Sequence, residues 1–283
     1  MPQTVVLTLK PEEAADVHRY APLAARAAGV AERDVALLRV VKRSIDARQR
    51  QPKVHLTLEL YADGEPQPAP VHFDYPQVGH RTEVVVVGSG PAGLFAAYIL
   101  AKSGNPPLLI DRGGAVDERI RKIDSFWSGG KLDKNTNVQF GEGGAGTFSD
   151  GKLNTGISDP YCRFVLKTFA DFGAPDDILY KAKPHIGTDM LRKVIVNMRN
   201  KLIEMGVEIK FNTRLTDLKI YGGKVSEIEL NKSESVSCEK LILALGHSAR
   251  DTFKTLWRRG VYIEPKPFAA GVRIEHKQSF IND

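Results

Sequence analysis

Four consecutive valines, Val84–Val87, followed at once by glycines at positions 88, 90 and 93, constrain this chain more than any other stretch. An apolar run of β-branched residues predicts a strand buried on both faces, as in a parallel sheet. In the G-x-G-x-x-G turn, Gly88 bends the chain, Gly90 admits a phosphate to the backbone and Gly93 lets a helix approach the strand. Pro91 begins that predicted helix, whose N-terminus attracts anions. The stretch therefore predicts a binding site for the pyrophosphate of a dinucleotide.

An acidic residue at the end of the next strand completes the fingerprint. Residues 108–110 form a second apolar run, and Asp111 follows them. It stands about 20 residues after the first glycine, where a group that accepts hydrogen bonds from a ribose is expected. The glycine pattern recurs at residues 141–146, but residues 137–140 are a poor candidate for a buried strand. We therefore place the dinucleotide site at the first match. The competing interpretation is a βαβ unit without a ligand.

Length and composition set the outer limits. The chain has 283 residues, 42% of them hydrophobic and 26% charged, which suits one large or two modest globular domains. Its two cysteines, Cys162 and Cys238, are far apart in sequence. The first residues lack the basic and apolar segments of a signal peptide. No apolar stretch is long enough to span a bilayer, so we expect a cytoplasmic protein without membrane contact.

Positive charge is spread unevenly. The net charge is +6, and the whole excess lies in residues 76–283, because residues 1–75 are neutral. Within the neutral part, residues 42–53 concentrate Lys and Arg. This stretch suits a phosphate or nucleic-acid contact, or the solvated end of a β-hairpin. We favour the hairpin and do not expect nucleic acid, because no aromatic side chains interleave the charges as base stacking requires.

Three segments divide the predicted α/β chain. Residues 1–75 show the order strand, helix (residues 11–28), strand, strand, which predicts a small α+β (βαββ) domain with its helix on a sheet. The Pro-rich residues 62–76 predict a linker. Residues 76–262 predict a Rossmann-like domain, with an irregular segment that follows Gly114 and extends to about residue 137. Residues 263–283 predict the beginning of an incomplete substrate domain.

Residues 141–156 are too rich in glycine to form a stable helix or strand. A loop of this kind lets the backbone approach a ligand, and its N–H groups can surround an anion. The other interpretation is a flexible surface loop. We favour ligand contact, because Phe148, Lys152 and Leu153 interrupt the glycines instead of serine-rich filler.

The order of these motifs resembles the glutathione-reductase-like superfamily of FAD-binding oxidoreductases. More narrowly, the chain is similar to a poorly characterised family of bacterial and plastid FAD-dependent dehydrogenases. The residues that carry this resemblance are 42–48, 87–93, 140–153, 185–189 and 244–251. The turn at Ala244-Leu245-Gly246 departs from the superfamily, where the middle residue is typically Thr. Family members are also much longer, and their closing flavin segment is missing here, so the resemblance implies a truncated chain with a three-layer ββα cofactor domain.

The resemblance implies FAD as cofactor and assigns its neighbours. Gly143 to Thr147 are expected on the flavin side, and Leu215 with Ala244 to Gly246 on the adenine side. Asp111 would repel the 2′-phosphate of NADP, whereas Arg112 beside it would not. The expected cofactor-binding residues are Gly88, Ser89, Gly90, Pro91, Ala92, Gly93, Asp111, Arg112, Gly143, Gly144, Ala145, Gly146, Thr147, Leu215, Ala244, Leu245 and Gly246.

Three functions remain open at the level of sequence. The first is an FAD-dependent oxidoreductase of unknown small-molecule substrate, with NAD(P)H as a possible external reductant. The second is a flavoprotein that acts on RNA through its N-terminal domain, and the third is a flavin-binding protein without catalysis. The glycine-rich segment contains no paired cysteines for a dithiol mechanism. We expect Cys162 to be a packing residue and not a thiol nucleophile. We assign no catalytic residue, since His185 and His247 are isolated, and no metal site.

Overall fold

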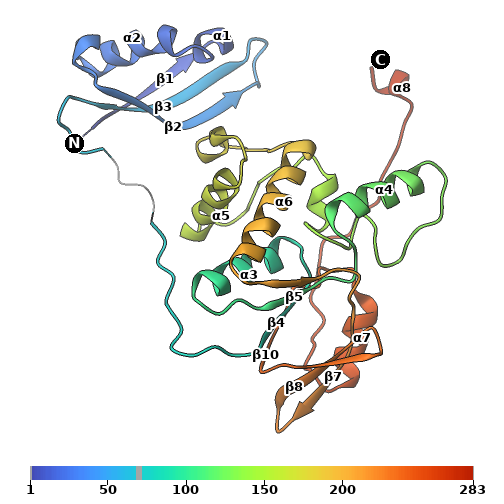
Figure 1. The fold of residues 1–283 in the computed structure, drawn as a ribbon. Coiled ribbons are helices and arrows are strands. Elements are labelled where there is room, and N and C mark those ends of the chain that lie inside the picture. Colours follow the sequence, from blue (N-terminus) through green and yellow to red (C-terminus); the bar gives the residue numbers. More distant parts are fainter. Residues whose placement is uncertain (1, 68–71, 283) are drawn as a thin grey trace.

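The computed structural model describes residues 2–67 and 72–282. Its first unit is an antiparallel sheet in the order β1-β3-β2, formed by β1 (Gln3–Leu9), β2 (Leu37–Asp46) and β3 (Lys53–Tyr61) (Figure 1). Alternate residues of β3, from Val54 to Leu60, are buried in a core that also contains residues of helix α2 (Val17–Ala28). The unit is the predicted α+β layer, with its helices on one face of the sheet.

The single helix predicted over residues 11–28 is wrong, because the chain breaks between α1 (Pro11–Ala14) and α2. Asp16 has extended backbone there, and its carboxylate accepts a hydrogen bond from the His18 N–H at 3.0 Å. This N-cap begins a new helix. A short 3₁₀ helix, η1 (Glu32–Asp34), precedes β2. The strands continue further into the basic stretch than expected, so the hairpin end is confined to residues 47–52.

The cofactor domain is organised around a parallel sheet in the order β10-β4-β5-β6. Its strands are β4 (Val84–Val87), β5 (Leu108–Ile110), β6 (Glu208–Lys210) and β10 (Lys240–Leu243). Helices α3 (Pro91–Lys102), α5 (Pro160–Asp171) and α6 (Thr188–Glu204) lie on one side of it (Figure 1). Strand β4 is buried throughout, as the run of valines predicted.

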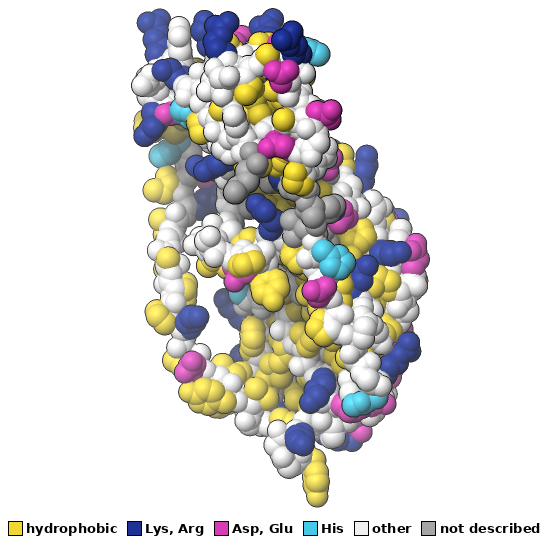
Figure 2. All heavy atoms as spheres, turned by 90° about the vertical axis from the view of Figure 1, so that its left-hand side faces the viewer, with side chains coloured by type: hydrophobic (Ala, Val, Ile, Leu, Met, Phe, Trp, Pro, Cys, Tyr) yellow, Lys and Arg dark blue, Asp and Glu magenta, His cyan; other side chains and the backbone are white. Residues whose placement is uncertain are grey.

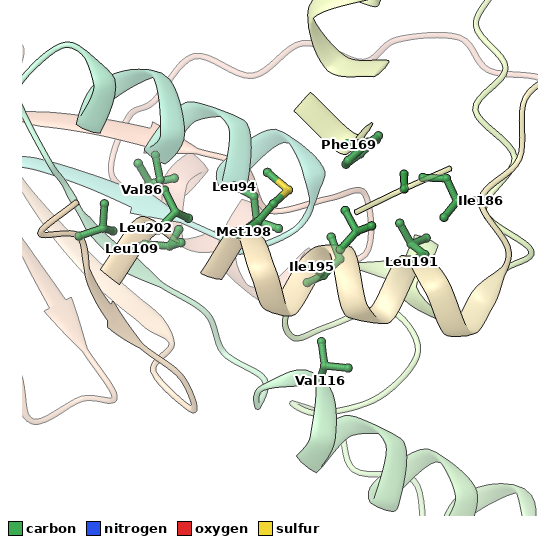
Figure 3. Close-up of a cluster of buried hydrophobic side chains, with 14 of the residues drawn as sticks. Val86, Leu94, Leu109, Val116, Phe169, Ile186, Leu191, Ile195, Met198 and Leu202 are labelled. Atoms are coloured by element: carbon green, nitrogen blue, oxygen red, sulfur yellow. The ribbon is translucent and has the colours of Figure 1, made fainter. Parts of the chain in front are cut away.

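Successive residues of the parallel strands face different layers, which produces the three-layer ββα arrangement. Val86 and Leu109 join the core formed with α3, α5 and α6 (Figure 3). Val85 and Val87 instead pack against a second, antiparallel sheet in the order β7-β8-β9. That sheet comprises β7 (Leu215–Tyr221), β8 (Lys224–Leu230) and β9 (Glu234–Ser237), and helix α7 (Arg250–Arg258) lies beside it. The Rossmann-like fold class is therefore confirmed.

The segment after Asp111 is not irregular, because it contains helix α4 (Val116–Trp127). Val116 and Ile123 are buried on one face of this helix together with Arg119, and Ile120 packs beside them. Recurrence at positions i, i+3, i+4 and i+7 is the helical pattern. An arginine in the buried stripe made that pattern hard to recognise.

Local details differ at the start of α6. Gly187 occupies the position before the helix, where a Ser, Thr, Asp or Asn cap is more usual. Thr188 is instead the first helical residue, and its hydroxyl donates to the carbonyl of Ser149 at 2.7 Å. This bond ties the glycine-rich segment to α6. The 3₁₀ helices η2 (Ala145–Phe148) and η3 (Asp176–Leu179) lie on either side of α5 in the sequence.

The N-terminal unit contacts the cofactor domain through its edge strand. The Arg43 N–H donates to the carbonyl of Tyr180 at 2.9 Å, and the Ala182 N–H donates to the carbonyl of Arg43 at 2.9 Å. The predicted linker, residues 62–76, falls partly outside the described residues. Its described end packs Phe73 against Phe164 of α5, with ring centroids 4.8 Å apart. Figure 2 shows this side of the molecule, where Lys and Arg side chains gather on the N-terminal unit at the top of the view.

Residues 261–277 form neither helix nor strand before the short helix α8 (Gln278–Asn282). Tyr262, Phe268 and Val272 are more than four-fifths exposed. The boundaries at residues 75 and 262 remain predictions. In the parts of the chain that the structure describes, no helix has both the length and the apolar character needed to cross a membrane.

Candidate functional site

The turn after β4 requires glycine at two positions for steric reasons. Gly88 has a φ of +105°, and a Cβ there would collide with the carbonyl of Ala244 at the end of β10. A Cβ on Gly93 would collide with the carbonyl of Gly88. These contacts bring the N-terminus of α3 directly against the carboxyl ends of β4 and β10. The first N–H groups of a helix have no partner within it, so they are free to bind an anion.

The glycine-rich loop lies against this turn. The Gly143 N–H donates to the carbonyl of Ser89 at 2.8 Å. A Cβ on Gly144 would lie 3.2 Å from both Gly90 Cα and Pro91 Cδ. Two segments about 50 residues apart in sequence therefore meet backbone to backbone, and glycine at position 144, with a φ of +64°, favours this close approach. The loop forms a second wall beside the helix N-terminus.

Asp111 is buried, at 5% exposure, and its carboxylate organises the turn. Oδ2 accepts from the backbone N–H of Ser89 at 2.7 Å and from its hydroxyl at 2.8 Å. Oδ1 accepts from the Gly113 N–H at 2.8 Å. Since a carboxylate has about four acceptor positions, one position on Oδ1 remains. Asp111 can therefore accept a single hydrogen bond from a ribose while it holds the turn.

Arg119 is completely buried, and its side chain binds the backbone of the glycine-rich loop. Its guanidinium donates to four backbone carbonyls, those of Asn137, Val138, Glu142 and Gly144. It also lies over the Phe148 ring, 4.8 Å from the centroid. Burial lowers the pKa of Arg119 to about 10, against the opposing influence of Asp111 and Glu142. The sequence analysis missed this residue.

Glu142 is the second buried charge that was missed. Its Oε2 accepts from the Val116 N–H at the start of α4 and from Nη1 of Arg199 in α6, both at 2.8 Å. Oε1 is buried and has no partner within the described residues. Burial raises the pKa of Glu142, although Val116 and Arg199 oppose the shift. The Glu142 side chain thus links the loop to two helices.

A cavity of about 380 Å³ opens beside the two glycine segments. Its volume is within the range of small-molecule and cofactor sites. Twelve predicted site residues line it, and they come from the turn after β4, the end of β5, the glycine-rich loop, the start of β7 and the end of β10. They are Gly88, Gly90, Pro91, Ala92, Asp111, Arg112, Gly144, Ala145, Leu215, Ala244, Leu245 and Gly246.

The other five predicted residues support this cavity or lie near it without lining it. Ser89 bonds to Asp111, Gly93 packs under the turn, and Gly143 bonds to Ser89. The buried Thr147 donates its hydroxyl to the carbonyl of Glu142 at 3.2 Å. Gly146 belongs to η2, and its carbonyl accepts from Ser149.

The two histidines considered from sequence separate in the structure. His247 lines the cavity. His185 instead forms an isolated backbone bridge with Lys152. Both cysteines are free, and neither Cys162 nor Cys238 lines the cavity. Within residues 2–67 and 72–282, no three potential metal ligands are grouped together.

Two arginines and an aspartate meet at one end of the cavity. Arg112 and Arg214 line it, and both bond to Oδ2 of Asp251, the second residue of α7. Arg112 also lies over the Phe140 ring, 4.6 Å from the centroid. Burial raises the pKa of Asp251, but Arg112 and Arg214 outweigh that effect and lower it overall. Arg214 was not predicted, because nothing local marks it.

Comparison with known proteins agrees with the geometry. Residues 81–121 match the FAD binding domain family, and residues 1–61 match a domain of unknown function, DUF8436. A Clostridium beijerinckii protein described only as uncharacterized is 40% identical over 269 residues, or 89% of this chain and 50% of that protein. The chain therefore spans about half the length of the curated relative that it matches.

Solved structures resemble parts of the chain at low identity. THI4 of Thermovibrio ammonificans is 18% identical, with a TM-score of 0.43, over 65% of this chain and 64% of that one. Glycine oxidase of Bacillus cereus is 14% identical, with a TM-score of 0.38, over 62% and 57% of the two chains.

The fold, the glycine turn and the family match define an FAD-binding protein with a Rossmann-like core. FAD is its cofactor, as predicted. The match of residues 81–121 to the FAD binding domain family confirms the resemblance to an FAD-dependent family seen in the motifs.

Proposed function

We propose that this chain is the cofactor-binding part of an FAD-dependent oxidoreductase, a dehydrogenase that acts on a small molecule. The observation that carries the proposal is the meeting of two glycine segments beside a lined cavity at the carboxyl ends of parallel strands. Open α/β sheets bind their ligands at this edge.

In this proposal each group of site residues would contact a different part of FAD. The N-terminus of α3, with Gly88 and Gly90, would bind the pyrophosphate. Asp111 would accept one hydrogen bond from the adenosine ribose, and Leu215 with residues 244–246 would contact the adenine side. Residues 143–147 would lie on the flavin side, with Gly144 and Ala145 at the cavity wall.

FAD supplies the redox chemistry when it is bound. The chain's own contribution would be to bind and orient it. Arg119 and Glu142 hold the glycine-rich loop in place, so its N–H groups would need little rearrangement when a ligand binds. Since neither cysteine lines the cavity, we do not propose a thiol relay. NADH or NADPH would act as an external reductant.

The test is purification of the full-length protein followed by an absorption spectrum and identification of any flavin released on denaturation. FAD in near-stoichiometric amount supports the proposal, and a colourless protein that neither retains nor rebinds FAD contradicts it. NADH and NADPH are then screened as reductants under anaerobic conditions. Bound FAD that no reductant or acceptor turns over would favour a flavin-binding protein without catalysis.

The RNA hypothesis gains no support from the N-terminal unit. Arg48 of the basic stretch is paired with Asp46 through two hydrogen bonds, of 2.9 and 2.7 Å, which neutralise it locally. The backbone N–H and carbonyl of Arg43 form hydrogen bonds with the cofactor domain. We therefore do not propose nucleic acid as a partner.

A further inference from the structure

Two arginine side chains lie at the end of the cavity near Asp111, although the ribose proposed to bind there carries no charge. Arg112 follows Asp111 directly, and Arg214 immediately precedes β7. Both line the cavity, whereas Asp251, which bonds to both, is not among the lining residues. Both arginines therefore belong to the cavity lining, and the half-exposed Asp251 carboxylate bonds to both of them.

Each arginine is held in place by other contacts. The Arg112 side chain is 11% exposed and is fixed between the Phe140 ring and Asp251. The Arg214 backbone N–H donates to Oδ1 of Asn231 at 2.9 Å, and its carbonyl accepts from the Asn231 N–H at 2.9 Å. Loss of Asp251 would therefore leave the Phe140 ring beside the Arg112 guanidinium and would leave the hydrogen bonds of the Arg214 backbone in place.

The balance of charge at this end depends on Asp251. Asp111 is the one acidic residue among those that line the cavity, and its oxygens are largely engaged by Ser89 and Gly113. With Asp251 in place, two arginines face two carboxylates. Without it, one positive charge is uncompensated where the ribose hydroxyls of an adenosine would lie.

We propose that Asp251 determines nucleotide selectivity, because its carboxylate neutralises Arg112 and Arg214 and so disfavours adenosine ligands that carry a 2′-phosphate. The inference rests on the proposed placement of the adenosine at this end. Arginine is well suited to bind a phosphate through two hydrogen bonds, and an unpaired pair of arginines would do so. Asp251 would thus act on the nucleotide through the two arginines, by neutralising their charge.

The test compares ADP with 2′,5′-ADP as probes, using calorimetry on the cofactor-depleted full-length chain at low salt. Asp251→Asn is expected to shift the ratio of the two affinities about tenfold toward 2′,5′-ADP, and added salt should reduce the shift. Asp217→Asn is the matched control, because Asp217 of β7 pairs with Arg259, the residue that follows α7, and neither residue lines the cavity. It should leave the ratio unchanged.

Arg214→Gln supplies a second measurement that keeps Asp251 in place, and it should move the ratio toward ADP. An unchanged ratio in folded Asp251→Asn protein, or a shift toward 2′,5′-ADP in Arg214→Gln, overturns the inference. Failure of the wild-type chain to bind either FAD or ADP would instead contradict the proposed function. Circular dichroism of each variant separates loss of fold from loss of selectivity.

Discussion

Arg119 Nη2 lies 2.9 Å from the carbonyl oxygen of Gly144, so a helix that precedes the glycine-rich loop holds the residue of that loop that approaches the glycine turn after β4. The same guanidinium binds three further carbonyls of residues 137–142. A buried cation surrounded by carbonyls fixes a loop that its own sequence leaves unconstrained. The part of the cavity wall that the loop forms is therefore held by a side chain of α4, although no residue of α4 lines the cavity.

Replacement of Arg119 by Met should loosen the loop. The four carbonyls that it binds would lose their donor within the core, which we expect to lower the free energy of unfolding by about 2–4 kcal/mol. FAD affinity should fall about tenfold or more, because the loop must then be ordered when the cofactor binds. Urea denaturation and flavin titration measure the two effects. Arg121→Met, on an exposed position of the same helix, is the control and should change neither.

Gly88→Ala tests the steric basis of the turn. The residue has a φ of +105°, and a Cβ would meet the Ala244 carbonyl. We expect a loss of about 2–4 kcal/mol of stability and at least a tenfold weaker affinity for FAD, since β10 and the turn cannot both keep their positions. Gly79→Ala, where a Cβ meets nothing within 4 Å, is the matched control. Wild-type FAD affinity in Gly88→Ala would contradict the proposed pyrophosphate site.

The turn and the sheet could be predicted from sequence because their signals are local. Four valines, three glycines and Asp111 lie within one short segment, and each has a fixed geometric role. The parts that were missed act over longer separations. Arg119 and Glu142 pair with groups 18 to 57 residues away, so their roles depend on how the loop, α4 and α6 meet. Arg214 and Asp251 likewise become neighbours only after β7 and α7 pack.

The N-terminal unit should detach without loss of the cofactor. Arg43→Pro removes the N–H that donates to Tyr180, and a proline on an edge strand disturbs the rest of the sheet little. We expect faster proteolysis in residues 62–76 and an unchanged flavin spectrum. Arg50→Pro, in the hairpin turn, should not alter the rate. Proteolysis at the wild-type rate in Arg43→Pro would show that other contacts hold the unit in place.

Glu142 predicts a contribution to stability that depends on pH. Burial raises its pKa in the folded state above the ordinary value of 4.5, so folding favours the protonated form. The contribution is therefore fully present below about pH 4.5 and is lost as pH rises through the folded pKa.

Glu142→Gln removes this titration, so the stability difference between wild type and variant should shift against the wild type as pH rises. Urea unfolding from pH 4 to 8 measures it, and Glu12→Gln on the exposed face of α1 should show no such trend. A difference that is constant with pH, or that moves in favour of the wild type, would contradict a raised pKa and would mean that Arg199 keeps Glu142 ionised.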